Sequence, residues 1–199
     1  MPSNKQQIIG ALVLAGGLSE RFKSNKLLHP LPDGTPLVLE TLSQLIGAKI
    51  PIHVITHPRQ TLLCKQLDTQ QVPRQQLTYS YTDSTQVGIG YSIAQGVQAT
   101  THWHGWLICL ADMPYIQSST YQQIAQQLQH SPLVKPYYQK QGGNPVGFGS
   151  QYRELLMNLQ GDQGARNIIQ QHEYFRLDVD DPGILMDIDR PEDIQHPGL

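Results

Sequence analysis

The fold class is decided by one apolar stretch near the start of the chain, Ile8-Ile9-Gly10-Ala11-Leu12-Val13-Leu14, which stops at Gly16-Gly17. A continuous run of this kind predicts a strand that is buried on both faces, as the strands of a parallel sheet are. Similar runs recur at 52–56, 77–81 and 105–111, and helical segments precede them at 36–47, 60–67 and 91–100. Strands that alternate with helices predict an α/β domain with a mostly parallel sheet, whose ligands bind beyond the carboxyl ends of the strands.

The second half of the chain is less regular. We expect strands at 133–138, 145–148, 174–179 and 184–188, and helices at 151–159 and 165–171. Asp181-Pro182-Gly183 has the composition of a turn and would join the last two of these strands. No repeat or linker divides the chain, which predicts a single domain over residues 1–199.

The composition excludes several classes of protein. The 199 residues are 39% hydrophobic, and the net charge of -2 predicts no surface for nucleic acid or for an anionic membrane. Cys64 and Cys109 lack the spacing of metal ligands, so we expect two reduced thiols. The start of the chain has no signal-peptide pattern, and no apolar run approaches the roughly 20 residues that span a bilayer. These features together predict a cytoplasmic protein.

A glycine loop with two cations follows the first strand directly. It reads Leu14-Ala15-Gly16-Gly17-Leu18-Ser19-Glu20-Arg21-Phe22-Lys23-Ser24-Asn25-Lys26. Glycines let backbone N–H groups approach an anion, and Arg21 and Lys26 add positive charge, so the loop predicts a polyphosphate site. A glycine turn with surface cations is the alternative. The Walker spacing is absent, and Gly88-Ile89-Gly90 is followed by Ile93 where a dinucleotide loop needs glycine.

Carboxylates occur at two places where the expected strands end. Asp112, in Leu110-Ala111-Asp112-Met113-Pro114, offers the hard oxygen ligands that suit Mg²⁺, or it caps the turn at Pro114. Asp187 and Asp189 are two residues apart on the last expected strand and would therefore face the same side. Like charges placed so repel unless a cation shares them. Alternatively, Asp189 caps a helix that begins near Pro191.

In their order along the chain, these motifs resemble those of the nucleotidyltransferases that mature the molybdenum cofactor, the MobA- and MocA-like branch of the NTP transferase superfamily. Leu-Ala-Gly-Gly-Leu-Ser-x-Arg-Phe-x-x-x-Lys is similar to the family's signature, and Asp-Met-Pro is similar to its metal motif. The C-terminal Asp-Ile-Asp-Arg-Pro-Glu-Asp also matches, with Arg190 in place of a threonine. Segments 88–96, 140–148 and 161–166 resemble its base-binding and acceptor segments, with Asn144 in place of the usual histidine.

The resemblance implies a three-layer Rossmann-like nucleotidyltransferase fold, with a mostly parallel central sheet and helices on both faces. Residues 1–115 would mainly bind the nucleotide and residues 116–199 mainly the acceptor. The implied catalytic residues are Lys26, Arg21 and Asp112, and Mg²⁺ would be held by Asp112 with Asp189, or with Asp187 as the alternate. The implied nucleotide-binding residues are Leu14, Ala15, Gly16, Gly17, Arg21, Lys26, Gly88, Gly90 and Ser92. The implied acceptor-binding residues are Gly143, Asn144, Pro145, Asp162 and Arg166.

The implied reaction is that of a molybdenum cofactor cytidylyltransferase, in which CTP and a molybdopterin-type phosphate give a dinucleotide and pyrophosphate. Leu-Ala-Gly-Gly is more usual in the guanylyl branch, so GTP remains an alternative, as does another phosphorylated acceptor. The alternative from a different functional class is a non-catalytic protein that binds a nucleotide and acts as a cofactor chaperone. The resemblance also suggests a molybdoenzyme or its chaperone as a protein partner. His53 and His57, at or near a strand end, are interpreted as structural.

Overall fold

The computed structural model describes residues 7–17, 25–70, 73, 76–83, 85–86 and 88–195. Its strands are β1 (Ile9–Ala15), β2 (Ile52–Thr56), β3 (Leu77–Tyr81), β4 (Gly105–Leu110), β5 (Leu133–Tyr138), β6 (Gln141–Gly142), β7 (Val146–Gly149) and β8 (Phe175–Asp178). Its α-helices are α1 (Leu37–Gly47), α2 (Thr61–Asp68), α3 (Ile89–Ala99), α4 (Ser118–Gln127), α5 (Arg153–Met157), α6 (Arg166–Gln171) and α7 (Pro191–Gln195). Short 3-10 helices are η1 (Lys26–Leu28), η2 (Ser150–Tyr152) and η3 (Pro182–Leu185).

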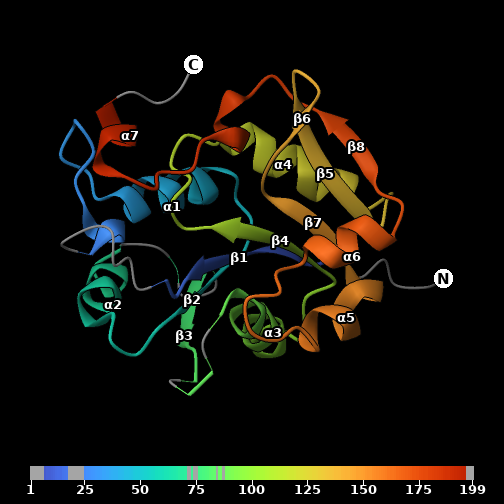
Figure 1. Cartoon of the computed structure of the whole chain (residues 1–199), viewed down its shortest axis with the longest axis horizontal. Coiled ribbons are helices and arrows are strands. Elements are labelled where there is room, and N and C mark those ends of the chain that lie inside the picture. Colours follow the sequence, from blue (N-terminus) through green and yellow to red (C-terminus); the bar gives the residue numbers. More distant parts are fainter. Residues whose placement is uncertain are drawn as a thin grey trace.

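The strands form one eight-stranded sheet in the order β3-β2-β1-β4-β7-β5-β6, with β8 paired to β5. The pairs β1–β2, β1–β4 and β2–β3 are parallel. β7 is antiparallel to both of its neighbours, β4 and β5, so β5 points in the same direction as β4. The carboxyl ends of β1, β2, β4 and β5 therefore meet along one rim of the sheet (Figure 1).

The central strands send alternate side chains into two hydrophobic cores, which explains their continuous apolar runs. In β1, Ala11 and Val13 belong to one core and Leu12 to the other. Helices α1, α2 and α4 cover the first core, and α3, α5 and α6 cover the second; α1 with α4 and α3 with α5 lie on opposite sides of the sheet in Figure 1. The predicted three-layer α/β fold is confirmed. Within the described ranges, no helix is both long and apolar enough to cross a membrane.

One predicted strand is wrong. Residues 184–188, which we expected to form a strand, begin inside the 3-10 helix η3 and continue as an extended segment outside the sheet. The cause is the turn before them: the side chain of Asp181 accepts a hydrogen bond from the Gly183 N–H at 2.9 Å, and Pro182 stands at the first position of the helical turn. Asp-Pro-Gly thus starts a helical turn instead of a hairpin.

Two helices also differ from expectation. The predicted helix 151–159 is split into η2 and the shorter α5, which ends at Met157. Helix α4 was not predicted, because its sequence SSTYQQIAQQ carries few apolar residues among glutamines. Its buried residues, Thr120, Tyr121, Ile124 and Ala125, nevertheless lie on one helical face, and the last three pack into the first core.

Candidate active site

The glycine loop leaves the carboxyl end of β1 and is anchored by the buried side chain of Gln60. Its Nε2 donates to the Gly17 carbonyl at 3.2 Å, and its Oε1 accepts from Asn25 Nδ2. Asn25 also caps η1, since its Oδ1 accepts from the Leu27 N–H at 3.2 Å. Lys26 therefore starts η1 in a defined position. Arg21, which we predicted to act with Lys26, lies outside the described residues.

The Lys26 ammonium lies between two carboxylates that are far apart in the sequence. Its Nζ is 2.8 Å from Oδ2 of Asp112 and 3.0 Å from Oδ1 of Asp189. The side chain of Lys26 is 8% exposed, that of Asp112 23% and that of Asp189 57%. The structure thus brings together three of the predicted site residues. Asp187, the alternate, is exposed.

The charges of the cluster decide the protonation of Lys26. Burial alone lowers the pKa of a lysine, but the hydrogen bonds and negative charges of Asp112 and Asp189 outweigh it and raise the pKa of Lys26 above its ordinary value. The side chain is therefore a permanent cation at neutral pH.

Two hydrogen bonds, one from α1 and one from the segment after η3, hold the backbone around Asp112. The hydroxyl of Thr41, on α1, donates to the Ala111 carbonyl at 3.0 Å. The Ile188 N–H donates to the Asp112 carbonyl at 3.0 Å, so the extended segment after η3 runs beside the end of β4. This contact places Asp189, the next residue, within reach of the Lys26 ammonium.

A cleft of about 470 Å³ opens beside this cluster, at the carboxyl ends of the strands. The described residues that line it include most of the predicted nucleotide-binding set: Leu14, Ala15, Gly16, Gly17, Lys26, Gly88 and Ser92, together with Asp112. The other described residues of the lining are Leu27, His57, Thr82, Gln86, Ile89, Leu110 and Asp162. Lys26 and Asp112 thus share one cleft with the glycine loop.

The start of α3 packs against residues 160–163, of which Asp162 lines the cleft. A Cβ at Gly88, whose φ is +128°, would lie 2.2 Å from the Gly161 carbonyl oxygen. The Gly90 N–H donates to the same carbonyl at 2.8 Å. Gly90 is therefore a packing residue that does not line the cleft, whereas Asp162, predicted for the acceptor, does line it.

A family model for the MobA-like NTP transferase domain matches residues 11–176 of this chain. The chain belongs to the MobA-like NTP transferase family. It is accordingly a nucleotidyltransferase, as the resemblance implied; the glycine loop and Asp112 lie inside the matched range, and Asp189 lies beyond it. No curated protein matches the chain in sequence.

Solved structures share the fold of this transferase. Rv0371c from Mycobacterium tuberculosis is 21% identical, with 96% of this chain and 97% of that chain covered and a TM-score of 0.79. Its manganese complex is 18% identical, with 87% and 88% covered and a TM-score of 0.70. Molybdopterin-guanine dinucleotide biosynthesis protein A from Archaeoglobus fulgidus is 14% identical (94% and 95% covered, TM-score 0.70). A 4-diphosphocytidyl-2C-methyl-D-erythritol synthase from Anaerococcus prevotii is 13% identical (95% of each chain covered, TM-score 0.75).

The donor atoms of the transferase suit a divalent cation. Oδ1 of Asp112 is buried and has no hydrogen-bond partner among the described residues, so one hard oxygen ligand is available. Over the same residues, no group of three or more His, Cys, Asp or Glu side chains could hold a metal ion alone. Two carboxylates plus substrate phosphates are the usual surroundings of Mg²⁺, so the pair Asp112–Asp189 fits this ion.

The contacts of Asp112 and Asp189 do not match the alternative roles predicted for them, as caps of a turn and of a helix. No described backbone N–H donates to the Asp112 side chain, which faces Lys26. Helix α7 does begin at Pro191, but no described backbone N–H donates to the Asp189 side chain; instead Oδ2 of Asp193, in the first turn, accepts from the N–H groups of Asp189 and Arg190 at 2.9 and 2.7 Å. The Asp189 carboxylate thus remains directed at Lys26.

The acceptor residues predicted for the transferase lie in two places. Gly143, Asn144 and Pro145 join β6 to β7, where the Gly143 N–H donates to the Pro136 carbonyl and the Asn144 N–H to the Ile184 carbonyl, both at 2.9 Å. Arg166 is exposed at the start of α6. The structure therefore does not gather this set into one cluster with Asp162.

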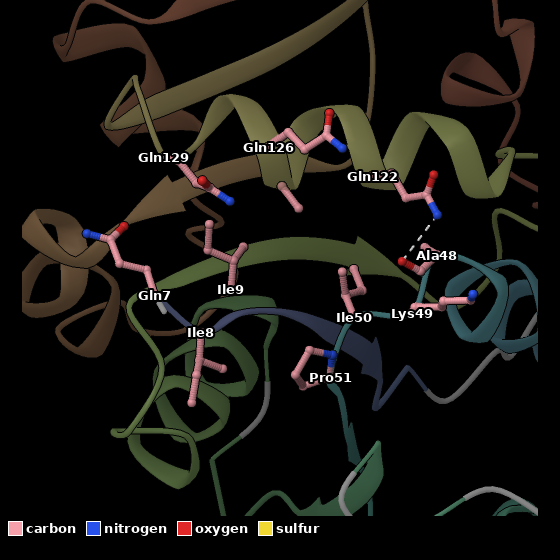
Figure 2. Close-up of a pocket in the computed structure, with 11 residues that line it drawn as sticks. Gln7, Ile8, Ile9, Ala48, Lys49, Ile50, Pro51, Gln122, Gln126 and Gln129 are labelled. Carbon is pink, nitrogen blue, oxygen red and sulfur yellow. Dashed lines mark hydrogen bonds between the residues drawn. The ribbon is translucent and has the colours of Figure 1, made fainter. Parts of the chain in front are cut away.

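A second hollow, of about 490 Å³, lies at the opposite end of the sheet. Figure 2 shows Gln122 and Gln126 of α4, with Gln129 just after the helix, on one side of it and Ile50 with Pro51 on the other. Among the described residues, its lining holds amides, apolar groups and a single charged side chain, Lys49, with no carboxylate or histidine. It lies away from the carboxyl ends of the strands, where chemistry is concentrated in α/β sheets.

Sequence reasoning missed the residues that hold or line the site without forming part of a motif. Gln60 anchors the glycine loop, and Thr82 and His57 follow the ends of β3 and β2 in the cleft wall. For Thr82 and His57, the position directly after a predicted strand was the signal that could have placed them in the site. His57 was interpreted as structural, and its Nδ1 does accept from the Arg59 N–H at 3.1 Å.

Proposed function

We propose that this transferase is a molybdenum cofactor cytidylyltransferase, which joins CTP to the phosphate of a molybdopterin-type acceptor and releases pyrophosphate. One observation carries the proposal: the Lys26 ammonium lies 2.8 Å from Asp112 and 3.0 Å from Asp189, and Lys26 and Asp112 line one cleft with the glycine loop. An isolated glycine turn would not need a buried ammonium held between two carboxylates. The presence of Ser92 and Gly88 in the same wall supports CTP, because the segment 88–96 resembles that of the cytidylyl branch.

The acceptor phosphate is ionised near neutral pH and needs no protein base. One of its oxygens forms a bond to the α-phosphorus, and the bond from that phosphorus to the β-phosphate oxygen breaks, so that pyrophosphate leaves with the electron pair. A divalent cation bound to Asp112 and Asp189 would supply neutralisation of phosphate charge. The N–H groups of Gly16 and Gly17 and the Lys26 ammonium stabilise the triphosphate and the leaving group by position and charge.

In this proposal the two halves of the chain have different roles. Residues 1–115 supply the glycine loop, Lys26 and Asp112 on the nucleotide side, with Arg21 assigned to the same role. Residues 116–199 supply the acceptor segment at Gly143–Pro145 and the second carboxylate, Asp189. The reaction would take place in the cytoplasm, and a molybdoenzyme or its chaperone would receive the product.

The test is an assay with purified protein, molybdopterin and Mg²⁺, with CTP compared against GTP. We expect pyrophosphate and the cytosine dinucleotide with CTP, and far slower release with GTP. A preference for GTP would reassign the enzyme to the guanylyl branch. Pyrophosphate release only with another phosphorylated acceptor would refute the molybdopterin assignment, and tight nucleotide binding without pyrophosphate release would favour a cofactor chaperone.

A further inference from the structure

A cluster of two tyrosines and two cations lies on the outer strands of the sheet, outside the cleft. The rings of Tyr137 on β5 and Tyr174, next to β8, are stacked, with centroids 6.4 Å apart, planes 13° apart and hydroxyls 2.6 Å apart. Lys135 Nζ lies 5.8 and 6.0 Å from the two ring centroids, and Arg176 Cζ lies 4.4 Å from that of Tyr137. We call these four residues the tyrosine cluster.

The tyrosine cluster lies on the same face of the sheet as the nucleotide cleft. Leu133 belongs to the core under α3, α5 and α6, and Val134 to the opposite core. Alternation along β5 therefore places Lys135 and Tyr137 on the face of α3. That helix and the 160–163 segment packed on it form walls of the cleft.

The strand register places the tyrosine cluster toward the rim of the sheet on which the cleft opens. Gly147 of β7 pairs with Leu107 of β4 and with Val134 of β5, so Leu107 and Val134 are level, two strand spacings or roughly 10 Å apart. From this level β4 continues to Leu110, which lines the cleft two residues before Asp112, and β5 continues to Tyr137. Tyr137 pairs with Gly142 of β6, next to the predicted acceptor segment Gly143–Pro145.

The charges of the tyrosine cluster are not balanced within the described part of the protein. Lys135 and Arg176 are directly opposite each other on β5 and β8, an arrangement of like charges that destabilises a sheet. Arg176 has a carboxylate partner in Asp178 at 2.7 Å, but no described carboxylate forms a salt bridge with Lys135. Tyr174 is 37% exposed, so flat ring surface and positive charge are both presented to solvent.

We propose that the tyrosine cluster binds the acceptor, by stacking a flat conjugated ring system on Tyr137 and Tyr174 and pairing an anionic substituent with Lys135 and Arg176. The acceptor's phosphate end then extends toward Asp112. The inference rests on the proposed function in taking the acceptor to be a flat, anionic molecule. The ring stack and the like-charge pair suit such a ligand because aromatic faces stack on aromatic faces and guanidinium and ammonium groups bind anions.

The first experiment measures binding without turnover. The probe is pterin-6-carboxylate, a flat fluorescent anion, titrated with the full-length protein. We expect the wild type to quench the probe, and Tyr137→Leu and Lys135→Gln each to weaken its binding about tenfold, the size of a lost stacking or ion-pair contact. Tyr81→Leu and Lys65→Gln, which remove an exposed tyrosine and an exposed lysine elsewhere, should bind the probe as the wild type does.

The second experiment separates this inference from the proposed function. With molybdopterin and CTP, the two cluster variants should raise the KM for the acceptor about tenfold while the KM for the nucleotide stays within about twofold. If the wild type binds the probe through the cluster yet releases no pyrophosphate with molybdopterin, the proposed function fails and the acceptor site stands. The inference is overturned if the wild type does not bind the probe, or if both cluster variants behave as the wild type.

Discussion

Among single residues, Asp112 is the one whose replacement tests the proposed site most directly. Asp112→Asn keeps the size of the side chain and removes the charge that Lys26 and a cation would share. We expect turnover to fall roughly 10³-fold or more, measured as pyrophosphate release. The free energy of unfolding should fall by no more than about 2 kcal/mol, because one hydrogen bond to Lys26 can persist.

The exposed carboxylate of Asp33, which accepts a hydrogen bond from the Thr35 N–H, provides the control. Asp33→Asn should leave turnover unchanged. If Asp112→Asn retained the turnover of the wild type with Mg²⁺, Asp112 would have no role in holding a cation.

Lys26 leads to a second prediction at this scale, because its ammonium occupies the space between the two carboxylates. A divalent cation that binds there must displace it. Lys26→Met should therefore bind Mn²⁺ about tenfold more tightly than the wild type in the absence of nucleotide, even though its turnover falls. Free Mn²⁺ can be measured by electron paramagnetic resonance, with Lys65→Met as the matched variant. Unchanged or weaker Mn²⁺ binding by Lys26→Met would show that the two cations do not compete.

Among the elements, the start of α3 depends on a glycine that no other residue can replace without strain. Gly88 has φ of +128°, and a Cβ there would overlap the Gly161 carbonyl. Gly88→Ala should push α3 away from residues 160–163 and raise the KM for the nucleotide, with a loss of stability of about 2–3 kcal/mol.

The control for this change is Gly34, whose φ is +88° but whose Cβ would meet nothing within 4 Å. Gly34→Ala should show only the backbone strain, about 1 kcal/mol, with no change in KM. Equal effects of the two substitutions on nucleotide KM would mean that the contact with Gly161 does not shape the cleft.

The pairing of β2 with β3 contains a buried histidine whose titration should affect stability. His53 bonds the hydroxyls of Thr78 and Ser80 at 2.8 Å each, and burial, with a smaller effect from His102, lowers its pKa to about 4. The unfolded chain takes up this proton near pH 6.5, before the folded protein does, so His53 stabilises the fold above that pH. Stability is lost as the pH falls from about 6.5 to about 4, by about 3 kcal/mol in all.

Urea unfolding of the wild type and of His53→Gln at pH 7 and pH 4.5 measures this contribution. The wild type should lose more stability over this interval than the variant. Parallel pH profiles for the wild type and His53→Gln would contradict the assignment.

At the scale of the whole molecule, Asp181 links segments that are more than sixty positions apart. Its carboxylate is 1% exposed and accepts from the Gln117 N–H and the Thr120 hydroxyl at the start of α4, and from the Gly183 N–H in η3. Asp181→Ala would leave these buried donors without a partner and should lower the free energy of unfolding by about 3–4 kcal/mol. Asp178→Ala, which removes an exposed carboxylate, should cost less than about 1 kcal/mol in the same urea titration.

The continuous apolar runs at 8–14, 52–56 and 105–111 were enough to predict the parallel centre of the sheet. A strand buried on both faces needs apolar residues at consecutive positions, and such a run can be recognised in one sequence. The glycine loop, Lys26 and Asp112 could be predicted for a similar reason: each directly follows, or closely follows, such a strand. Helix α4 and the helical form of the turn at 182–185 escaped prediction, since packing against α1 and the capping by Asp181 outweighed their local composition.

The sequence by itself determined the fold class, the family and the rim of the sheet on which the chemistry lies. Only the tertiary structure decided that Asp189, rather than Asp187, meets Lys26 and that Gln60 anchors the glycine loop. It also showed that the tyrosine cluster faces the same side as the cleft. These relations join residues as much as 163 positions apart, and no local pattern records them because they depend on strand register and on how segments pack across the core.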